Sequence, residues 1–253
     1  MSDMYPDPPH LTVAVYSTQP EITTFAGMCD VARDLGCDPV NLVEVAPKDR
    51  DFELLADLGD ARTIEKVSSI RRAQLVAGQD PALRVIRARY SHREFGKVIV
   101  HYVLRHGSGP HPIGVTVSAD AFGYPEDEWS ASMRRSACAL DDWSRDVLRA
   151  AAAKCDPLYG AIGVEFSLSS PQELMASTQP GLSTQLFVSR HLLDEDRRLD
   201  PKLREAFSGA GITDWNEGIF YTGWAPDRDR EFTIRAAARA LAHALGTDSQ
   251  WEM

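Results

Sequence analysis

Two glutamates, Glu165 and Glu44, occupy similar places in the sequence and are the first candidates for acid–base chemistry. Glu165 ends the apolar segment "GAIGVE" within residues 155–168, and Glu44 lies in "NLVEV". Strand alternation places Glu165 on one face with small residues, where a shallow pocket would raise its pKa by removing water. Two such carboxylates could act as an acid and a base. A solvated sheet face, or an ion pair with an arginine such as Arg190, also explains Glu165, and we favour this structural interpretation.

Other catalytic and metal-binding patterns are weak. The sequence contains no GxSxG, GxGxxG or GxxxxGK[ST] motif. His101, His106 and His111 are evenly spaced, but positions five apart on a strand fall on opposite faces, so they do not predict a metal site. The cysteines lack CxxC spacing and are expected to be reduced thiols: Cys29, Cys37, Cys138 and Cys155. We therefore expect no metal and no cofactor.

Aromatic and acidic residues gather in the segment "DWNEGIFYTGW" (214–224), which points to binding rather than catalysis. Phe220 and Tyr221 fall on opposite faces of a strand, so we expect at least one of them to be exposed or at an interface, with Tyr221 the first choice for an exposed aromatic. Such residues often dominate the energy of protein interfaces. The alternative is that the tryptophans only close the core. The predicted binding residues are Asp214, Trp215, Glu217, Tyr221, Trp224 and Asp227.

The net charge of −10 favours a basic protein partner and argues against nucleic acid, whose phosphates need clustered Lys and Arg. Solubility alone also explains an acidic surface. No apolar run approaches the roughly 20 residues that span a bilayer, so we expect no membrane association. The first residues lack a basic segment followed by an apolar one, and we expect a cytoplasmic protein.

The elements that must position these residues alternate between strand and helix. The first half predicts the following elements: strand 11–17, helix 20–36, a strand from 37, helix 63–77, and strands 84–90, 97–106 and 113–118. The second half predicts helix 125–154, strand 155–166, helix 171–177, strand 185–192, helix 200–211, strand 217–224 and helix 229–245.

This order predicts an α+β fold with a mixed or antiparallel sheet and packed helices. A strand, a helix, Cys-Asp-Pro and a second strand with Val-Glu occur twice, which suggests two remotely duplicated halves, 1–120 and 121–253, in one compact unit. Chance explains the repeat equally well, because Asp-Pro is a common helix stop.

Residues 140–224 resemble the bacterial immunity proteins that accompany polymorphic toxins. The resemblance is carried by Trp143, "DPLYGAIGVEF" and "QLFVSRHLL". The chain departs from that pattern at Tyr159, where tryptophan is as common, and it lacks a Gly-Trp before "LFVS". The resemblance implies a cytoplasmic α+β protein that inactivates a toxin by tight binding, and it carries over no catalytic residues.

The sequence therefore favours a binding protein, with a toxin-neutralising immunity protein as the first hypothesis and a basic toxin domain as its partner. One alternative is a small-molecule enzyme that uses Glu165, Glu44 or a histidine as general acid or base. Another is an interaction subunit of a bacterial assembly. The oligomeric state does not follow from the sequence.

Overall fold

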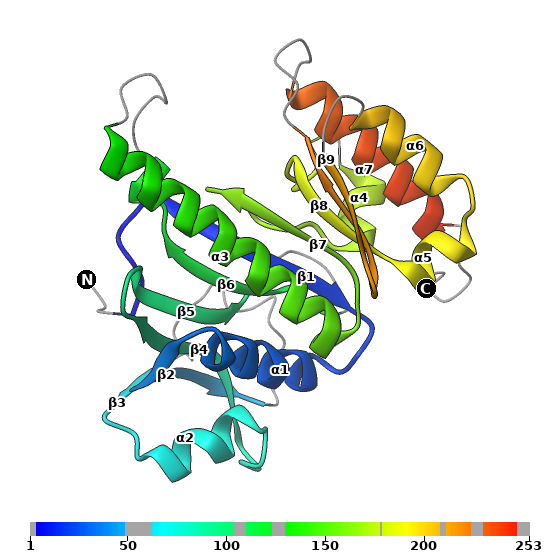
Figure 1. Ribbon diagram of the computed structural model, residues 1–253. Helices are drawn as coiled ribbons and strands as arrows, with labels where there is room; N and C mark the ends of the chain where they lie inside the picture. The colour runs from blue at the N-terminus through cyan, green and yellow to red at the C-terminus, as the bar shows by residue number, and fades with distance from the viewer. Residues whose placement is uncertain are drawn as a thin grey trace.

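Ten strands form one sheet in the computed structural model, which describes residues 4–48, 62–103, 110–122, 130–177, 179–207, 211–223 and 230–246 (Figure 1). The strand order is β3-β2-β4-β5-β6-β1-β7-β8-β10-β9, and every neighbouring pair is antiparallel. The strands are β1 (His10–Ser17), β2 (Cys37–Pro47), β3 (Arg62–Glu65), β4 (Leu83–His92), β5 (Gly96–Tyr102), β6 (Ile113–Ser118), β7 (Pro157–Val164), β8 (Gln185–Ser189), β9 (Gly211–Trp215) and β10 (Gly218–Thr222). The α+β class with an antiparallel sheet is confirmed.

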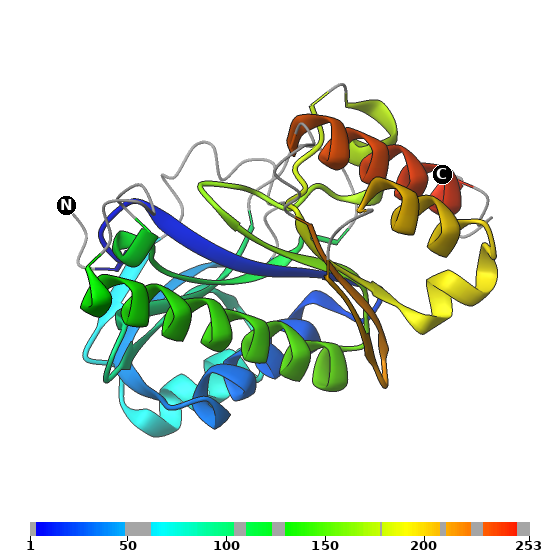
Figure 2. The same cartoon turned by 45° about the horizontal axis from the view of Figure 1, so that its top comes forward.

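Helices cover opposite faces of the sheet in its two halves (Figure 2). One face, here called the first face, carries α1, α2 and α3, and the opposite or second face carries α4, α6 and α7. The helices are α1 (Glu21–Asp34), α2 (Ser69–Val76), α3 (Ala131–Cys155), α4 (Pro171–Ala176), α5 (Arg190–Glu195), α6 (Leu199–Ala206) and α7 (Arg230–Gly246). Within the described residues, no helix combines the length and the apolar character needed to cross a membrane.

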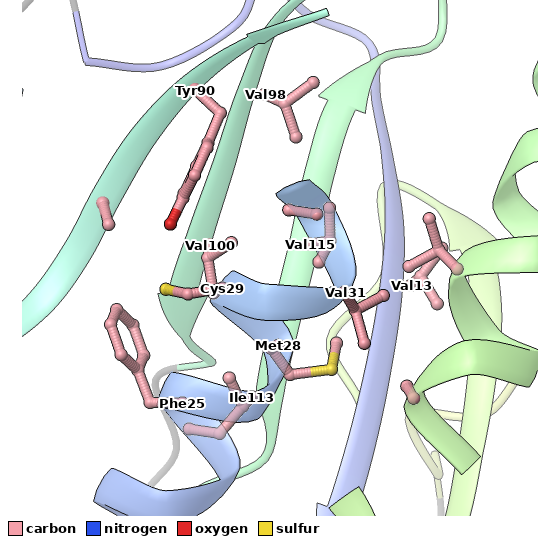
Figure 3. Close-up of a cluster of buried hydrophobic side chains, with 14 of the residues drawn as sticks. Val13, Phe25, Met28, Cys29, Val31, Tyr90, Val98, Val100, Ile113 and Val115 are labelled. Carbon is pink, nitrogen blue, oxygen red and sulfur yellow. The ribbon is translucent and has the colours of Figure 1, made fainter. Parts of the chain in front are cut away.

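The core of the first face is built by α1 against the valine-rich strands (Figure 3). Phe25 and Met28 are fully buried and point from the helix toward the sheet. The opposing strands contribute β-branched side chains, which pack well on a pleated surface: Val13, Val98, Val100, Ile113 and Val115. Full burial of a side chain of this size contributes about 1.5–3 kcal/mol, so this cluster is a main source of stability.

Strand β1 lies in the interior of the sheet and is buried on both faces. This burial explains why "LTVAVYS" does not alternate between apolar and polar residues. Val13 and Val15 belong to the core of the first face, whereas Ala14 and Tyr16 belong to that of the second face. A strand buried on both faces is expected to be nearly continuous in apolar residues.

Three sequence predictions about the elements were wrong or incomplete. The helix predicted over 63–77 begins only at Ser69, because residues 62–65 pair with β2 as strand β3. The strand predicted over 185–192 ends at Ser189, whose hydroxyl accepts a hydrogen bond of 3.2 Å from the Leu192 N–H and so caps α5. The helix predicted over 200–211 ends at Ala206, and Gly211 instead begins strand β9, which was not predicted.

The two strand–helix–Cys-Asp-Pro units are connected differently within the sheet. Helix α1 connects β1 to β2 across three intervening strands, whereas α3 connects β6 to β7 across β1 alone. Both helices end in a left-handed residue, Gly36 with φ 85° and Asp156 with φ 45°. The duplication stays a prediction, and strand pairing between β1 and β7 crosses the predicted boundary at 120/121.

A candidate protein-binding groove

The β9–β10 hairpin carries the aromatic and acidic residues singled out in the sequence. Its strands are joined by the two-residue turn Asn216–Glu217, and Trp215 pairs with Gly218. Trp215 stacks on Phe220 with ring centroids 4.7 Å apart, and on Phe187 of β8 at 5.5 Å. Gly218 makes room for this stack, because a Cβ there would lie 2.8 Å from the Phe187 ring and 2.2 Å from the Val188 carbonyl oxygen.

A groove of about 710 Å³ lies between this hairpin and α3. The hairpin contributes five consecutive residues to it, from Thr213 to Glu217. Helix α3 contributes a polar edge and a floor of small residues, and the end of α1 contributes Leu35. The α3 residues are Asp146, Arg149, Ala150 and Ala153.

The charge of the groove is predominantly negative. Asp146, Asp214 and Glu217 line it, and Arg149 is the one basic side chain in its lining within the described residues. Arg190 follows β8 beside the turn of the hairpin, where its guanidinium donates to Asp214 Oδ1 at 2.9 Å and to the Trp215 carbonyl oxygen at 3.0 Å. This partner fixes the Asp214 side chain, whereas Asp146 and Glu217 form no ion pair within the described residues.

The structure brings together only part of the predicted binding set. Asp214, Trp215 and Glu217 line the groove together. Trp224 and Asp227 lie outside the described residues. The hypothesis that Trp215 closes the core is also consistent with the structure, because Trp215 is half-buried against Phe187 and Phe220 while its remaining surface lines the groove.

The predicted exposure of Tyr221 is wrong. Its side chain is fully buried on the second face, and Phe220 is 2% exposed on the first face. Strand alternation predicted that one face of this strand meets solvent, but helices α6 and α7 cover the second face, on which Tyr221 lies. The Tyr221 hydroxyl donates to Asp200 Oδ1 at 2.7 Å, and burial together with this bond raises the pKa of Tyr221 above its usual range.

Glu165 lies one residue beyond β7, in the left-handed region at φ 49°. It does not pair with Arg190. Its carboxylate accepts the His10 backbone N–H at 2.5 Å and lies 3.3 Å from His10 Nδ1, while the side chain is 57% exposed. These contacts fasten the end of β7 to the start of β1, which agrees with a structural role.

Glu44 is held in an ion pair with Arg87 on the neighbouring strand β4, and both side chains are largely buried. Strands β2 and β7 are five positions apart in the sheet, which at about 4.8 Å per strand is roughly 24 Å. This separation argues against the alternative in which Glu44 and Glu165 act as one acid–base pair, because such a pair must reach one substrate.

Glu165 and His10 line a small pocket of about 250 Å³ on the second face, as the shallow-pocket alternative expected for Glu165. The same pocket contains a hydrogen-bonded chain that the sequence did not reveal. His101 Nδ1 donates to the Tyr102 carbonyl oxygen at 3.0 Å, so Nε2 accepts from the Thr116 hydroxyl at 2.8 Å. Thr116 in turn accepts from Thr12 at 2.8 Å. The three residues lie on three strands, and only their pairing in the sheet brings them together.

This chain resembles a hydroxyl nucleophile beside its base, but its electrostatics are unfavourable for that chemistry. Burial, together with the nearby positive charge of Arg87, lowers the pKa of His101 to about 4. A general base works best with a pKa near the operating pH, so His101 is a weak base at neutral pH. The chain is better explained as a means of satisfying polar groups within the sheet.

The remaining histidines and the cysteines do not assemble a metal site in the described part of the chain. His111 is bound to Glu21 through its backbone N–H at 2.6 Å and its Nδ1 at 2.7 Å, and His106 lies outside the described residues. The four cysteines are free thiols, and burial raises the pKa of Cys29, Cys37 and Cys155 to about 12. The expected absence of a metal stays a prediction.

Known proteins show little similarity to this chain. No family model matches the sequence, and no curated protein matches it. Among solved structures, the chain is similar to the Pseudomonas aeruginosa T6SS protein PA0821, with 12% identity and a TM-score of 0.41. The match covers 94% of this chain and 74% of that protein. A likeness of this size carries no argument about function.

Proposed function

We propose that the protein binds a basic protein partner without catalysis, through the groove between α3 and the β9–β10 hairpin. In the immunity-protein hypothesis, this partner is a toxin domain that the protein neutralises. The observation that carries the proposal is the groove itself: about 710 Å³, lined by three carboxylates, one arginine and the face of a stacked tryptophan.

The chemistry of the groove suits a basic surface segment. A net acidic lining raises the rate of association with a basic partner, and this effect weakens as salt screens the charges. Trp215 is held in place by stacking on Phe220 and Phe187, so the part of its ring that lines the groove loses little conformational freedom on binding. A residue of this kind is a natural hot spot.

Binding kinetics at two ionic strengths, measured against any basic toxin domain that a neighbouring gene is found to encode, test the proposal. Replacing Asp146 by Asn together with Glu217 by Gln should slow association at low salt and reduce its salt dependence. The matched control removes the same charge outside the groove, at Asp7 and Glu231. Equal association rates for both double variants would contradict the proposal.

Trp215→Ala tests the apolar anchor. Loss of a hot spot costs on the order of 2 kcal/mol, which corresponds to about a 30-fold faster dissociation. Tyr221→Phe is the control, because Tyr221 lies on the buried second face and its substitution affects stability without altering the groove.

A further inference from the structure

We infer that the partner is bound by strand addition: a basic extended segment pairs with the free edge of β9 and so becomes an eleventh strand of the sheet. This inference rests on the proposed function and specifies how the groove is used. In the described part of the chain, β9 is the last strand on its side and pairs only with β10.

The phase of the hydrogen bonds shows which groups of β9 face outward. On the inner side of β10, the Glu217 carbonyl accepts from Arg190 N–H at 2.7 Å, and Gly223 N–H donates to the Thr184 carbonyl at 2.8 Å. Odd-numbered positions of β10 therefore bond toward β8, and even-numbered positions bond toward β9. On β9 the partners of the even positions are Gly211, Thr213 and Trp215. The N–H and C=O groups of Ile212 and Asp214 consequently point to the free edge.

The groove lies beside the turn end of this edge, from Thr213 onward, while Ile212 packs against the second face and continues the edge beyond the groove. Successive side chains of a strand point to opposite faces, so a groove on one face alone would be lined by alternate residues. This groove is instead lined by the consecutive residues Thr213, Asp214 and Trp215, which places it beside the backbone of β9. A segment lying there would meet the Asp146 and Glu217 carboxylates and the Trp215 ring.

The two edge strands of the sheet, β9 and β3, differ in charge and in protective residues. Proteins commonly protect edge strands with Lys, Pro or a β-bulge. The β9 sequence "GITDW" contains neither Lys nor Pro, and its pairing with β10 has no register shift. At the opposite edge, Arg62 begins β3 and Lys66 follows it. Arg62 and Lys66 outnumber Glu65 in the sequence of the β3 edge, whereas carboxylates outnumber arginine in the groove at the β9 edge, so a basic segment is favoured at the β9 edge.

The test uses a labelled synthetic peptide of alternating lysine and valine, whose binding is followed by fluorescence anisotropy. Ile212→Pro removes the outward N–H of β9 without removing a donor of the β9–β10 ladder, and proline is tolerated on edge strands. Ile212→Ala is the matched control, because it loses the side chain but keeps the N–H. We expect the proline variant to bind about tenfold more weakly or worse, and the alanine variant to bind like the wild type.

A second peptide with methylated backbone nitrogens tests the same point on the unaltered protein, because it keeps its charge but cannot donate to a strand. We expect it to lose binding to the same degree. Equal affinity for both peptides would overturn strand addition, as would an unmethylated peptide that does not bind. If both peptides bind equally and the Asp146→Asn, Glu217→Gln variant weakens them, the groove hypothesis stands without strand addition. If that variant also has no effect, both inferences are wrong.

Discussion

Tyr221→Phe separates the stability of the hairpin from its binding function. The substitution removes one hydroxyl and leaves the ring, which packs against Phe207 with centroids 5.5 Å apart. The lost interaction is the 2.7 Å hydrogen bond to Asp200. Hydrogen bonds to charged groups contribute about 1.5–3 kcal/mol. Asp200 stays bound to Arg204 Nε through both carboxylate oxygens at 2.8 Å, so no carboxylate is left without a partner.

The expected loss of unfolding free energy is therefore at or just below the lower end of this range, about 1–2 kcal/mol. For a chain of about 250 residues this lowers Tm by roughly 2–8 °C. Thermal unfolding followed by circular dichroism measures the loss, and binding kinetics measure the function. Tyr221→Phe should bind its partner at the wild-type rates. Unchanged stability, or a large loss of affinity in a folded variant, would refute the buried position of Tyr221 on the face away from the groove.

Four further outcomes are expected. Glu165→Gln should change the unfolding free energy by less than about 1 kcal/mol and leave partner binding intact, because the side chain is mostly exposed; a loss of function with an intact fold would favour the enzyme hypothesis. Gly160→Ala should destabilise by about 1–3 kcal/mol in denaturant titrations, because the new Cβ would lie 2.8 Å from Leu148 Cδ1 and 2.9 Å from the Ala14 carbonyl oxygen; unchanged stability would contradict this close packing. Burial tends to raise the pKa of Glu21, but the hydrogen bonds to His111 outweigh burial and lower this pKa. The stability that Glu21 contributes is therefore present above its unfolded pKa and is lost as pH falls through its folded pKa. Glu21→Gln should flatten the fall of unfolding free energy at acid pH, and an unchanged fall would contradict this linkage. The pKa of His101 is about 4 in the folded protein, below the ordinary 6.5. The stability that neutral His101 contributes is therefore complete above pH 6.5 and is lost as pH falls from about 6.5 to 4. Over this range the unfolding free energy of His101→Gln should fall less than that of the wild type.

The sequence was most informative where local pattern and burial agree. The β-branched run at β1 and the amphipathic periodicity of α1 and α3 predicted these elements because their packing follows directly from their residue types. Strand β9 was missed because "GITDW" is mostly exposed and has one β-branched aliphatic residue. Its strand character comes from pairing with β10, which single-segment patterns do not contain.

The candidate site was predictable only in its hairpin half. Asp214, Trp215 and Glu217 were found because they are close in sequence. The opposite wall, with Asp146 and Arg149 on α3, lies more than sixty positions away and looked like an ordinary solvated helix face. Tyr221 was misplaced for a related reason: alternation gives the face of a side chain, but only tertiary packing determines whether that face meets water.

The position of β1 in the sheet has a consequence for synthesis on the ribosome. Leu11 pairs with Val164, which is made 153 positions later, and His10 pairs with Ser118. At about 5–20 residues per second, β1 waits roughly 8–30 s before β7 can exist. Both edges of this apolar strand are unpaired until β6 is made, and one edge stays unpaired from then until β7 is made, so the nascent chain is exposed to mispairing throughout. We expect ribosome-bound chains arrested after β6 to show little protection of β1 amides on the β7 side, and full protection once residue 164 has left the exit tunnel. Early protection of those amides would show that another segment covers the edge in the meantime.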